Sequence, residues 1–542
     1  MTQPPATPGP GQGPAEEGRF GPPPHLPGQP AGFGPPPPPR PAGFGPPPRP
    51  AGFGPPVPPP PGGFGPPEPP VPPRRSARRR TVLVVASVAA LALLAGGGAW
   101  YVVADGDGGD GGRGTSAKKP GPAYAQPKEV VPADPKATFT GGAPVPKLPK
   151  GEDYWPVNGS WLTDEVYAKA SVQRITGLDA GTGKVRWTLE KPGQSCAGSR
   201  EIGTGGIAVV VTAPTTHGSS GNRAPCTEVM AFELATGKKL WATSLKIGYQ
   251  RTKTEFNQVV ISGRTVAVAG LYGGAAFDLR TGEPRWKPRA GETCQDVGYG
   301  GGARLVAVRR CGEYGSETYR VQDLDPVSGK PRWSHKLPAG VTNLNVLSTD
   351  PVVVGLDSGE VSGSGATDVF ALDRRGRLRS KTALPDRRYL HNCGSTSVVN
   401  DCRGIVVGND KLYVPTARRD GSKRYSSTND LVAFALSTGR LTGPRGNAHE
   451  GAPMFPIRMD GGNVIAYRDY GGVEVVTLDG RTMKEKRLLT ARGRPSGMLA
   501  VSSETLYAHG RLYVSSTLLA KPRPTAPKEM MMYAYARNDD DR

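Results

Sequence analysis

Between residues 151 and 542 the apolar positions gather in short runs that are bounded by Gly, Asp and Asn. Examples are "GIAVVVTA" from Gly206, "TVAVAG" from Thr265, "KLYVPTA" from Lys411 and "RLYVSST" from Arg511. The runs are rich in β-branched side chains, as strands are, and no long segment has the 3.6-residue apolar period of an amphipathic helix. The pattern predicts an all-β domain of many short antiparallel strands.

A ten-residue unit recurs between these strands. It reads "LDAGTGKVRW" at 178–187, "FELATGKKLW" at 232–241, "FDLRTGEPRW" at 277–286 and "LDPVSGKPRW" at 324–333, with weaker copies from Leu372, Phe434 and Thr477. We expect its acid to accept hydrogen bonds from N–H groups of the turn, and its Gly to supply a positive φ. We expect its Trp to lie in the seam between repeats, the alternative being a stacking surface for a ligand. The clearest copies contribute Gly183, Gly237, Gly282, Gly329, Trp187, Trp241, Trp286 and Trp333.

The spacing of the unit indicates the architecture. Counting weaker copies through Gly376, Gly439 and Gly480, successive glycines lie 54, 45, 47, 47, 63 and 41 residues apart. A period in the mid-forties filled with short strands is typical of a β-propeller with four-stranded antiparallel blades. Seven units plus a carboxy-terminal set of strands without its own unit predict eight blades, with seven as the alternative. Pairing a strand from one terminus with strands from the other would close the ring.

The unit resembles the pyrroloquinoline-quinone-like (PQQ-like) propeller repeat, over roughly residues 150 to 540. The resemblance implies the fold; the family includes quinone-dependent dehydrogenases as well as cofactor-free scaffolds and sensor domains. Its dehydrogenases use adjacent cysteines, a calcium held by acids and an Asp base, whereas no two cysteines are adjacent here and no C-x-x-C-H motif occurs. We therefore expect no catalytic residue, metal or cofactor, the alternative being a PQQ-dependent dehydrogenase.

The six cysteines fall as three neighbouring pairs along the sequence. An even number of cysteines in an oxidising compartment predicts disulfides. The sequence leaves 15 pairings open, of which the nearest-neighbour pairing is our prediction because each pair falls within one repeat interval. A zinc site at His391, Cys393 and Cys402 is the alternative for the last pair. The predicted disulfides join Cys196 to Cys226, Cys294 to Cys311 and Cys393 to Cys402.

The first 150 residues have a different composition. Residues 1–80 are rich in Pro and Gly and end in "RRSARRR", and residues 81–103 carry no charge. We expect a disordered cytoplasmic tail over 1–80, which is either a spacer or a docking segment for a cytoplasmic partner. A single transmembrane helix over 81–103 and a flexible linker over 104–150 then precede the propeller at 151–542. The arginines before the helix place the amino terminus in the cytoplasm and the propeller outside the cell membrane.

Charge suggests what such a propeller binds. The chain has a formal net charge of +21, which favours anionic envelope polymers or an envelope protein as partners, although dispersed charge also serves solubility. No motif indicates nucleic acid. The Gly, Ala and Arg content is typical of a high-GC Gram-positive (actinobacterial) source. We expect a non-catalytic binding or scaffold module at the envelope, with binding residues in a long basic loop at Arg418, Arg419, Lys423 and Arg424.

Overall fold

The computed structural model describes residues 128–537, except 247–251, 289–290, 314, 359–361, 395–397, 425, 450–452, 469–471, 494–502 and 523–528. The predicted tail (1–80), the predicted transmembrane helix (81–103) and the linker up to residue 127 lie outside the described residues and stay predictions. Within the described part, no helix is both long and apolar enough to cross a membrane.

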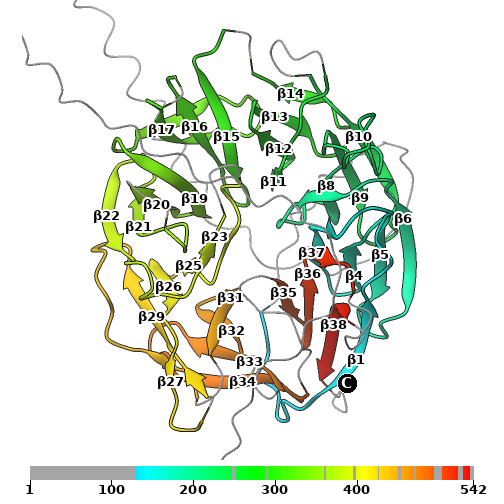
Figure 1. Ribbon diagram of the computed structural model, residues 1–542. Helices are drawn as coiled ribbons and strands as arrows, with labels where there is room; N and C mark the ends of the chain where they lie inside the picture. The colour runs from blue at the N-terminus through cyan, green and yellow to red at the C-terminus, as the bar shows by residue number, and fades with distance from the viewer. Residues whose placement is uncertain are drawn as a thin grey trace, which may run out of the picture. The chain divides into compact units, whose positions relative to one another are not determined.

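Eight four-stranded antiparallel sheets stand around a common centre as the blades of a propeller (Figure 1). The predicted all-β fold with eight blades is confirmed, and the alternative of seven is wrong. Blade 1 consists of β3 (Ser160–Leu162), β4 (Val166–Ala170), β5 (Arg174–Asp179) and β6 (Val185–Glu190), and blade 2 of β7 (Ser195–Gly198), β8 (Ile207–Thr212), β9 (Glu228–Glu233) and β10 (Lys239–Thr243). Blade 3 consists of β11 (Gln258–Ser262), β12 (Thr265–Gly270), β13 (Gly273–Asp278) and β14 (Pro284–Trp286), and blade 4 of β15 (Cys294–Gly300), β16 (Leu305–Cys311), β17 (Thr318–Leu324) and β18 (Pro331–Lys336).

The other four blades follow the same order along the chain until the last. Blade 5 consists of β19 (Val341–Thr349), β20 (Val352–Ser358), β21 (Asp368–Leu372) and β22 (Leu378–Ala383), and blade 6 of β25 (Val406–Gly408), β26 (Lys411–Pro415), β29 (Asp430–Ala435) and β30 (Gly446–Asn447). Blade 7 consists of β31 (Met454–Asp460), β32 (Asn463–Arg468), β33 (Gly472–Asp479) and β34 (Glu485–Arg492), and blade 8 of β35 (Ser503–Ala508), β36 (Arg511–Ser516), β38 (Met530–Arg537) and β1 (Ala137–Pro144). In Figure 1 the first strands, such as β11, β31 and β35, face the centre, and fourth strands such as β6, β22 and β34 form the rim.

The last blade closes the ring with a strand from the other end of the domain. β1 pairs with β38 in an antiparallel register that sets Ala137 opposite Arg537. This pairing confirms the predicted closure of the ring by strands from both ends of the domain. The predicted start of the propeller at residue 151 was too late, because β1 already belongs to it. Farther upstream, the Glu129 carboxylate contacts Arg458 at 3.0 Å and accepts a bond from the backbone N–H of His509 at 2.9 Å. The described part of the expected flexible linker is therefore fixed to blades 7 and 8.

The strands owe their apolar runs to their position between blades. β8 and β12 are buried at all their residues, because a neighbouring blade covers each face of their sheets. At the rim, β6 instead alternates between exposed and partly buried positions. Short continuous apolar runs therefore mark the inner strands, and they form a separate small core in each seam.

The repeated Trp fills the seam at the rim, where the sequence placed it. The Trp187 indole Nε1 donates to the Leu234 carbonyl of the next blade at 2.9 Å, and its ring covers Gly237, where a Cβ would overlap it. Trp241 repeats this arrangement with the Leu279 carbonyl, at 2.9 Å, and Gly282. Two further pairs follow around the ring: Trp286 with Gly329, and Trp333 with Gly376. The turn glycine is thus needed twice, for its positive φ and for the missing side chain.

The acid of the unit holds the turn together. Asp325 Oδ1 accepts bonds from the backbone N–H and the hydroxyl of Ser328, both at 2.9 Å. These bonds favour the carboxylate and lower the pKa of Asp325 to about 2. One turn departs from the prediction: in the unit after Thr477, Met483 and not Gly480 has the positive φ. The equivalent position of this unit is therefore Met483, three residues after the glycine that we counted. The interval of 41 residues between Gly439 and Gly480 does not measure the repeat at this point.

The two faces of the ring differ in their connections. Successive strands run in opposite directions, so the turns between first and second strands and between third and fourth strands lie on one face, here the repeat face. The other connections lie on the opposite face, here the insertion face, which has the long segments 213–227, 244–257, 384–405, 416–429 and 517–529. Three two-stranded sheets decorate these connections: β2 (Tyr154–Pro156) with β37 (Leu518–Ala520), β23 (Asn392–Cys393) with β24 (Cys402–Arg403), and β27 (Arg419–Asp420) with β28 (Ser427–Thr428).

All three disulfides lie at the insertion face. They join the predicted nearest neighbours: Cys196 to Cys226, Cys294 to Cys311 and Cys393 to Cys402. Two of them hold the connections that contain Cys226 and Cys393–Cys402, whereas Cys294 and Cys311 face each other in the ladder and join the paired ends of β15 and β16. The His391 Nε2 donates a hydrogen bond to the Ala366 carbonyl at 2.9 Å, and Cys393 and Cys402 are joined in a disulfide. The zinc site considered at these three residues therefore lacks thiolate ligands.

Candidate functional site in the central channel

One insertion turns inward and fills part of the channel. Residues 393–394 and 398–405, here called the plug, belong to the connection between blades 5 and 6 and are clasped by the Cys393–Cys402 disulfide. Val399 is fully buried, and its carbonyl accepts a bond from the Val346 N–H of β19 at 2.7 Å. Gly298 of β15 has no room for a Cβ because Val399 lies against it. The plug therefore packs against the inner strands of blades 4 and 5.

Two buried amides hold the base of the plug. The Nδ2 groups of Asn343 and Asn345 both donate to the Gly394 carbonyl, at 3.1 and 3.0 Å, and to the Gly365 carbonyl, at 2.9 and 3.3 Å. These asparagines lie on β19, the first strand of blade 5. Burying amides is favourable only when their donors are satisfied, so this contact fixes the position of the plug.

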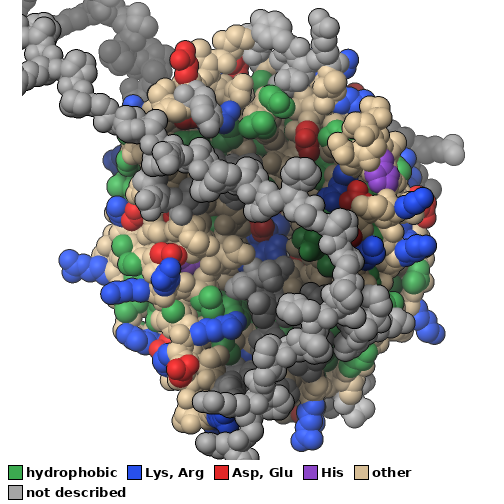
Figure 2. Space-filling model, viewed as in Figure 1, with side chains coloured by type: hydrophobic (Ala, Val, Ile, Leu, Met, Phe, Trp, Pro, Cys, Tyr) green, Lys and Arg blue, Asp and Glu red, His purple; other side chains and the backbone are tan. Residues whose placement is uncertain are grey.

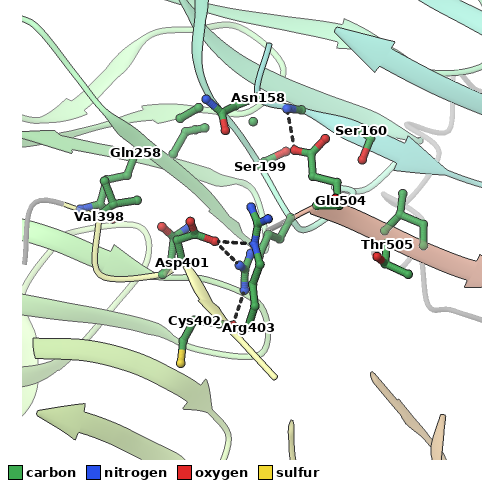
Figure 3. Close-up of a pocket in the computed structure, with 18 of the residues that line it drawn as sticks. Asn158, Ser160, Ser199, Gln258, Val398, Asp401, Cys402, Arg403, Glu504 and Thr505 are labelled. Carbon is green, nitrogen blue, oxygen red and sulfur yellow. Dashed lines mark hydrogen bonds and ion pairs between the residues drawn. The ribbon is translucent and has the colours of Figure 1, made fainter. Parts of the chain in front are cut away.

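A cavity of about 290 Å³ remains beside the plug. Its wall comes from the first strands of blades 1, 2, 3, 7 and 8, and polar groups of the plug complete it (Figure 3). Figure 3 shows Asp401 and Arg403 of the plug on one side and Glu504 and Ser160 on the other. The cavity is thus lined by both polar and apolar side chains from segments far apart in the sequence.

On the plug side, two guanidinium groups share one carboxylate. Asp401 Oδ1 accepts bonds from Arg200 NH2 at 2.7 Å and from Arg403 Nε at 3.1 Å, while Arg200 NH1 also reaches the Cys402 carbonyl at 3.4 Å. Burial by itself raises the pKa of Asp401, but the two guanidiniums outweigh it and hold the pKa below its usual value. Asp401 is therefore ionised at neutral pH. The groups that line this side of the cavity, two guanidiniums and one carboxylate, carry one excess positive charge, and the buried Glu201 outside the lining also interacts electrostatically with Arg200.

On the opposite side, an ion pair crosses from blade 8 to blade 1. Glu504 Oε1 accepts from the Gly159 N–H at 2.8 Å, and Oε2 meets Lys169 Nζ at 2.7 Å. Lys169 is 2% exposed and also donates to the Val157 carbonyl at 2.6 Å. Burial lowers the pKa of Lys169, and Glu504 opposes that shift. This pair is neutral overall, so the excess positive charge of the cavity comes from Arg200 and Arg403.

The comparisons with known proteins now place the chain. Two overlapping segments, 161–293 and 225–479, match the family model described as outer membrane protein assembly factor BamB, and together they cover more than half of the chain. The chain belongs to the PQQ-like β-propeller family. No curated protein sequence matches it.

Solved structures with a similar fold are distant in sequence. BamB from Moraxella catarrhalis is 15% identical, with 74% of this chain and 100% of that chain covered at a TM-score of 0.40. The quinohemoprotein alcohol dehydrogenase from Comamonas testosteroni is 11% identical, with 76% and 78% covered at a TM-score of 0.43. Saccharomyces cerevisiae Sqt1 is 12% identical, with 74% and 100% covered at a TM-score of 0.40. These likenesses concern the propeller fold.

The residues of the cavity do not fit the calcium that quinone-dependent members of the family hold. Calcium in proteins takes six to eight oxygen ligands, several of them from carboxylates. Among the described residues, no three His, Cys, Asp or Glu side chains come together as metal ligands. The two acids of the cavity, Asp401 and Glu504, are already engaged by cations. The donor set is suited to an anion and not to a divalent cation.

The loop residues predicted to bind lie elsewhere, on the insertion of blade 6. Arg419 is held by Asp430 through two contacts of 3.1 and 3.0 Å, and the Arg418 guanidinium lies 5.9 Å from the centre of the Phe455 ring. Arg418, Lys423 and Arg424 are exposed. In the insertion from Thr215, Arg223 is paired with Glu152 at 2.6 Å. The structure thus keeps Arg418, Lys423 and Arg424 at the surface and uses Arg419 and Arg223 to hold the insertions in place.

Sequence reasoning missed the whole cavity. The charged residues that line it are Arg200, Asp401, Arg403 and Glu504. Together with Lys169, the partner of Glu504, they lie on four separate segments and belong to no motif. The one available signal was the short Cys393–Cys402 spacing in an interval that exceeded the common period. That spacing indicated a clasped insertion, but not that the insertion points into the channel.

Proposed function

We propose that this chain is a non-catalytic binding module of the cell envelope, in which the propeller displays its insertion face to a partner. The observation that carries the proposal is the gathering of the long connections and all three disulfides at one face. Loops fixed on a rigid scaffold lose little entropy on binding, which is why such faces make good binding surfaces. In this proposal, residues 81–103 anchor the chain in the membrane, with the amino terminus in the cytoplasm.

For the partner we propose an anionic envelope polymer. The connection before blade 6 runs beside the blade 6 insertion, since the Ala417 N–H donates to the Arg388 carbonyl at 2.8 Å. This contact brings exposed Arg387 and Arg388 next to exposed Arg418, with Lys423 on the same insertion. We call these four residues the blade 6 patch. Figure 2 shows Lys and Arg side chains prominent around the rim of the visible face. Residues 81–542 carry +16 of the formal net charge of +21, which strengthens the attraction to polyanions at low salt.

The test measures retention of the purified full-length chain, in detergent, on sedimented envelope material. Changing Arg387, Arg388, Arg418 and Lys423 to Ser should lower retention at least threefold, and salt should reduce what remains. A matched control changes four exposed basic residues of repeat-face turns to Ser and should retain wild-type binding: Lys184, Lys238, Arg374 and Arg375.

Two results would count against the proposal. Equal loss in both variants would mean that net charge alone holds the chain on the material. Retention that survives polymer extraction but not protease treatment of the material would point to an envelope protein. For the dehydrogenase alternative, dye reduction on adding quinone, calcium and an alcohol is the diagnostic reaction, and we expect none.

A further inference from the structure

We propose that the channel cavity is a second binding site, for a small hydroxylated oxyanion such as a sugar acid or a sugar phosphate. The geometry that carries it is two guanidiniums, from Arg200 and Arg403, that share the single carboxylate of Asp401 at the cavity wall. Its proposed ligand contacts are not residues of the blade 6 patch, although Arg418 of that patch lies over Phe455 of the cavity wall, and the proposal does not depend on envelope binding.

The charge balance favours an anion. Arg403 uses its Nε for Asp401, and within the described part of the chain its NH1 and NH2 groups have no partner. Arg403 lines the cavity, and its side chain is only 19% exposed. A guanidinium fork with unused donors matches the two oxygens of a carboxylate or phosphate. An oxyanion would neutralise the excess charge that Asp401 leaves.

The opposite wall favours hydroxyl groups on the same ligand. The Glu504 oxygens each accept one bond from the protein and keep lone pairs for further donors. Ser160 and Thr505 also line this wall. Because Lys169 neutralises Glu504, the wall does not repel an anion as a bare carboxylate would. A volume of about 290 Å³ accommodates one ligand of monosaccharide size.

The arginines are positioned before any ligand binds. Arg403 follows Cys402, whose disulfide clasps the plug, and Val399 fixes the plug against β19. Arg200 follows β7 of blade 2 and is drawn to the plug by Asp401. Binding therefore requires little reorganisation, which improves affinity for a small ligand.

The experiment is calorimetric titration of the full-length chain, in detergent at neutral pH and low salt. The probes are D-glucuronate and glucose 1-phosphate, with uncharged D-glucose for comparison. We expect both anions to bind at least tenfold more tightly than glucose. A preference for one anion identifies the ligand as a carboxylate or a phosphate. Equal affinity for glucose, or no heat with either anion, would overturn the proposal.

Three variants test the assignment of residues. Arg403→Gln and Arg200→Gln should each weaken anion binding at least tenfold. Asp401→Asn should strengthen it, because the amide oxygen can still accept bonds from the guanidiniums but no longer carries the negative charge that offsets them and repels an anion. The opposite signs separate a binding role from a structural one, since loss of fold would weaken binding in all three. Unchanged affinity in Arg403→Gln, or weaker binding in a folded Asp401→Asn variant, would refute the site. A variant that changes only Arg387 and Arg388 of the blade 6 patch, and keeps Arg418 over Phe455 of the cavity wall, should bind these small anions normally, so the two proposals fail independently.

Discussion

The repeat face and the insertion face of this propeller are held together by different means. On the repeat face, turns are fixed by bonds within a few residues, such as that from the Thr182 N–H to Asp179 Oδ1 at 2.7 Å. In four successive units the Trp of the preceding blade covers the turn glycine. On the insertion face, connections of unequal length are fixed by disulfides and by ion pairs such as Arg223 to Glu152. Regular local chemistry builds the ring, and irregular long-range contacts shape the surface that can acquire a function.

The largest expected effect distinguishes two glycines with the same backbone conformation. Gly237 on the repeat face has φ +71 and lies under the Trp187 ring, while Gly221 on the insertion face has φ +78 and nothing within 4 Å. Gly237→Ala should lower the free energy of unfolding by about 4 kcal/mol, from left-handed strain and displacement of the ring. Gly221→Ala should cost about 1 kcal/mol from strain alone. Denaturant unfolding of the two variants measures the difference.

A double variant identifies the cause. In a Trp187→Ala background, the extra cost of Gly237→Ala over Gly221→Ala should vanish, because no ring remains to be displaced. If the two alanines are equally costly in the wild-type background, the seam contact does not set the requirement for glycine, and the contrast between the faces fails at this point.

The next effect concerns the disulfides of the insertion face. Changing Cys196 and Cys226 to Ala removes a link across 30 residues, which should lower the free energy of unfolding by about 3 kcal/mol. Limited proteolysis should then show new cleavage within 213–227, while the turn at Gly237 stays protected. Cleavage that appears equally on both faces would mean that the disulfide supports the whole ring and not one face.

The smallest effect is the acid sensitivity of the repeat face. Backbone hydrogen bonds lower the pKa of Asp325 and Asp373 to about 2, below the value of about 3.9 for an unfolded Asp. Stability from these turns is therefore present above pH 4 and is lost as the pH falls towards 2. The denaturation midpoint of an Asp325→Asn, Asp373→Asn variant should fall less steeply over this range than that of the wild type. A slope as steep as the wild type's would place the acid sensitivity elsewhere.

The sequence by itself determined the ring, because the physics of the repeat is local. An acid, a Thr-Gly pair and a Trp within ten residues specify a turn and the start of the next strand, and recurrence at blade-like spacing specifies the propeller. Even the exception obeyed local rules: in the last unit Met483 takes the positive φ, and the Asp479 hydrogen bonds to the turn remain, including that to the Thr482 N–H at 2.7 Å. The disulfide pairs were also readable, since each joins residues of one repeat interval.

Only the tertiary structure decided which insertion enters the channel and which charges meet there. Asp401 lies 201 residues from Arg200, and Lys169 lies 335 residues from Glu504. No periodicity or motif relates such positions, since their contact depends on how many blades the ring has and how far each inner strand reaches. The same holds for Glu129, which the composition assigned to a flexible linker and the fold attached to Arg458. Local turn chemistry propagates along the sequence, whereas a site in the channel exists only once the ring has closed.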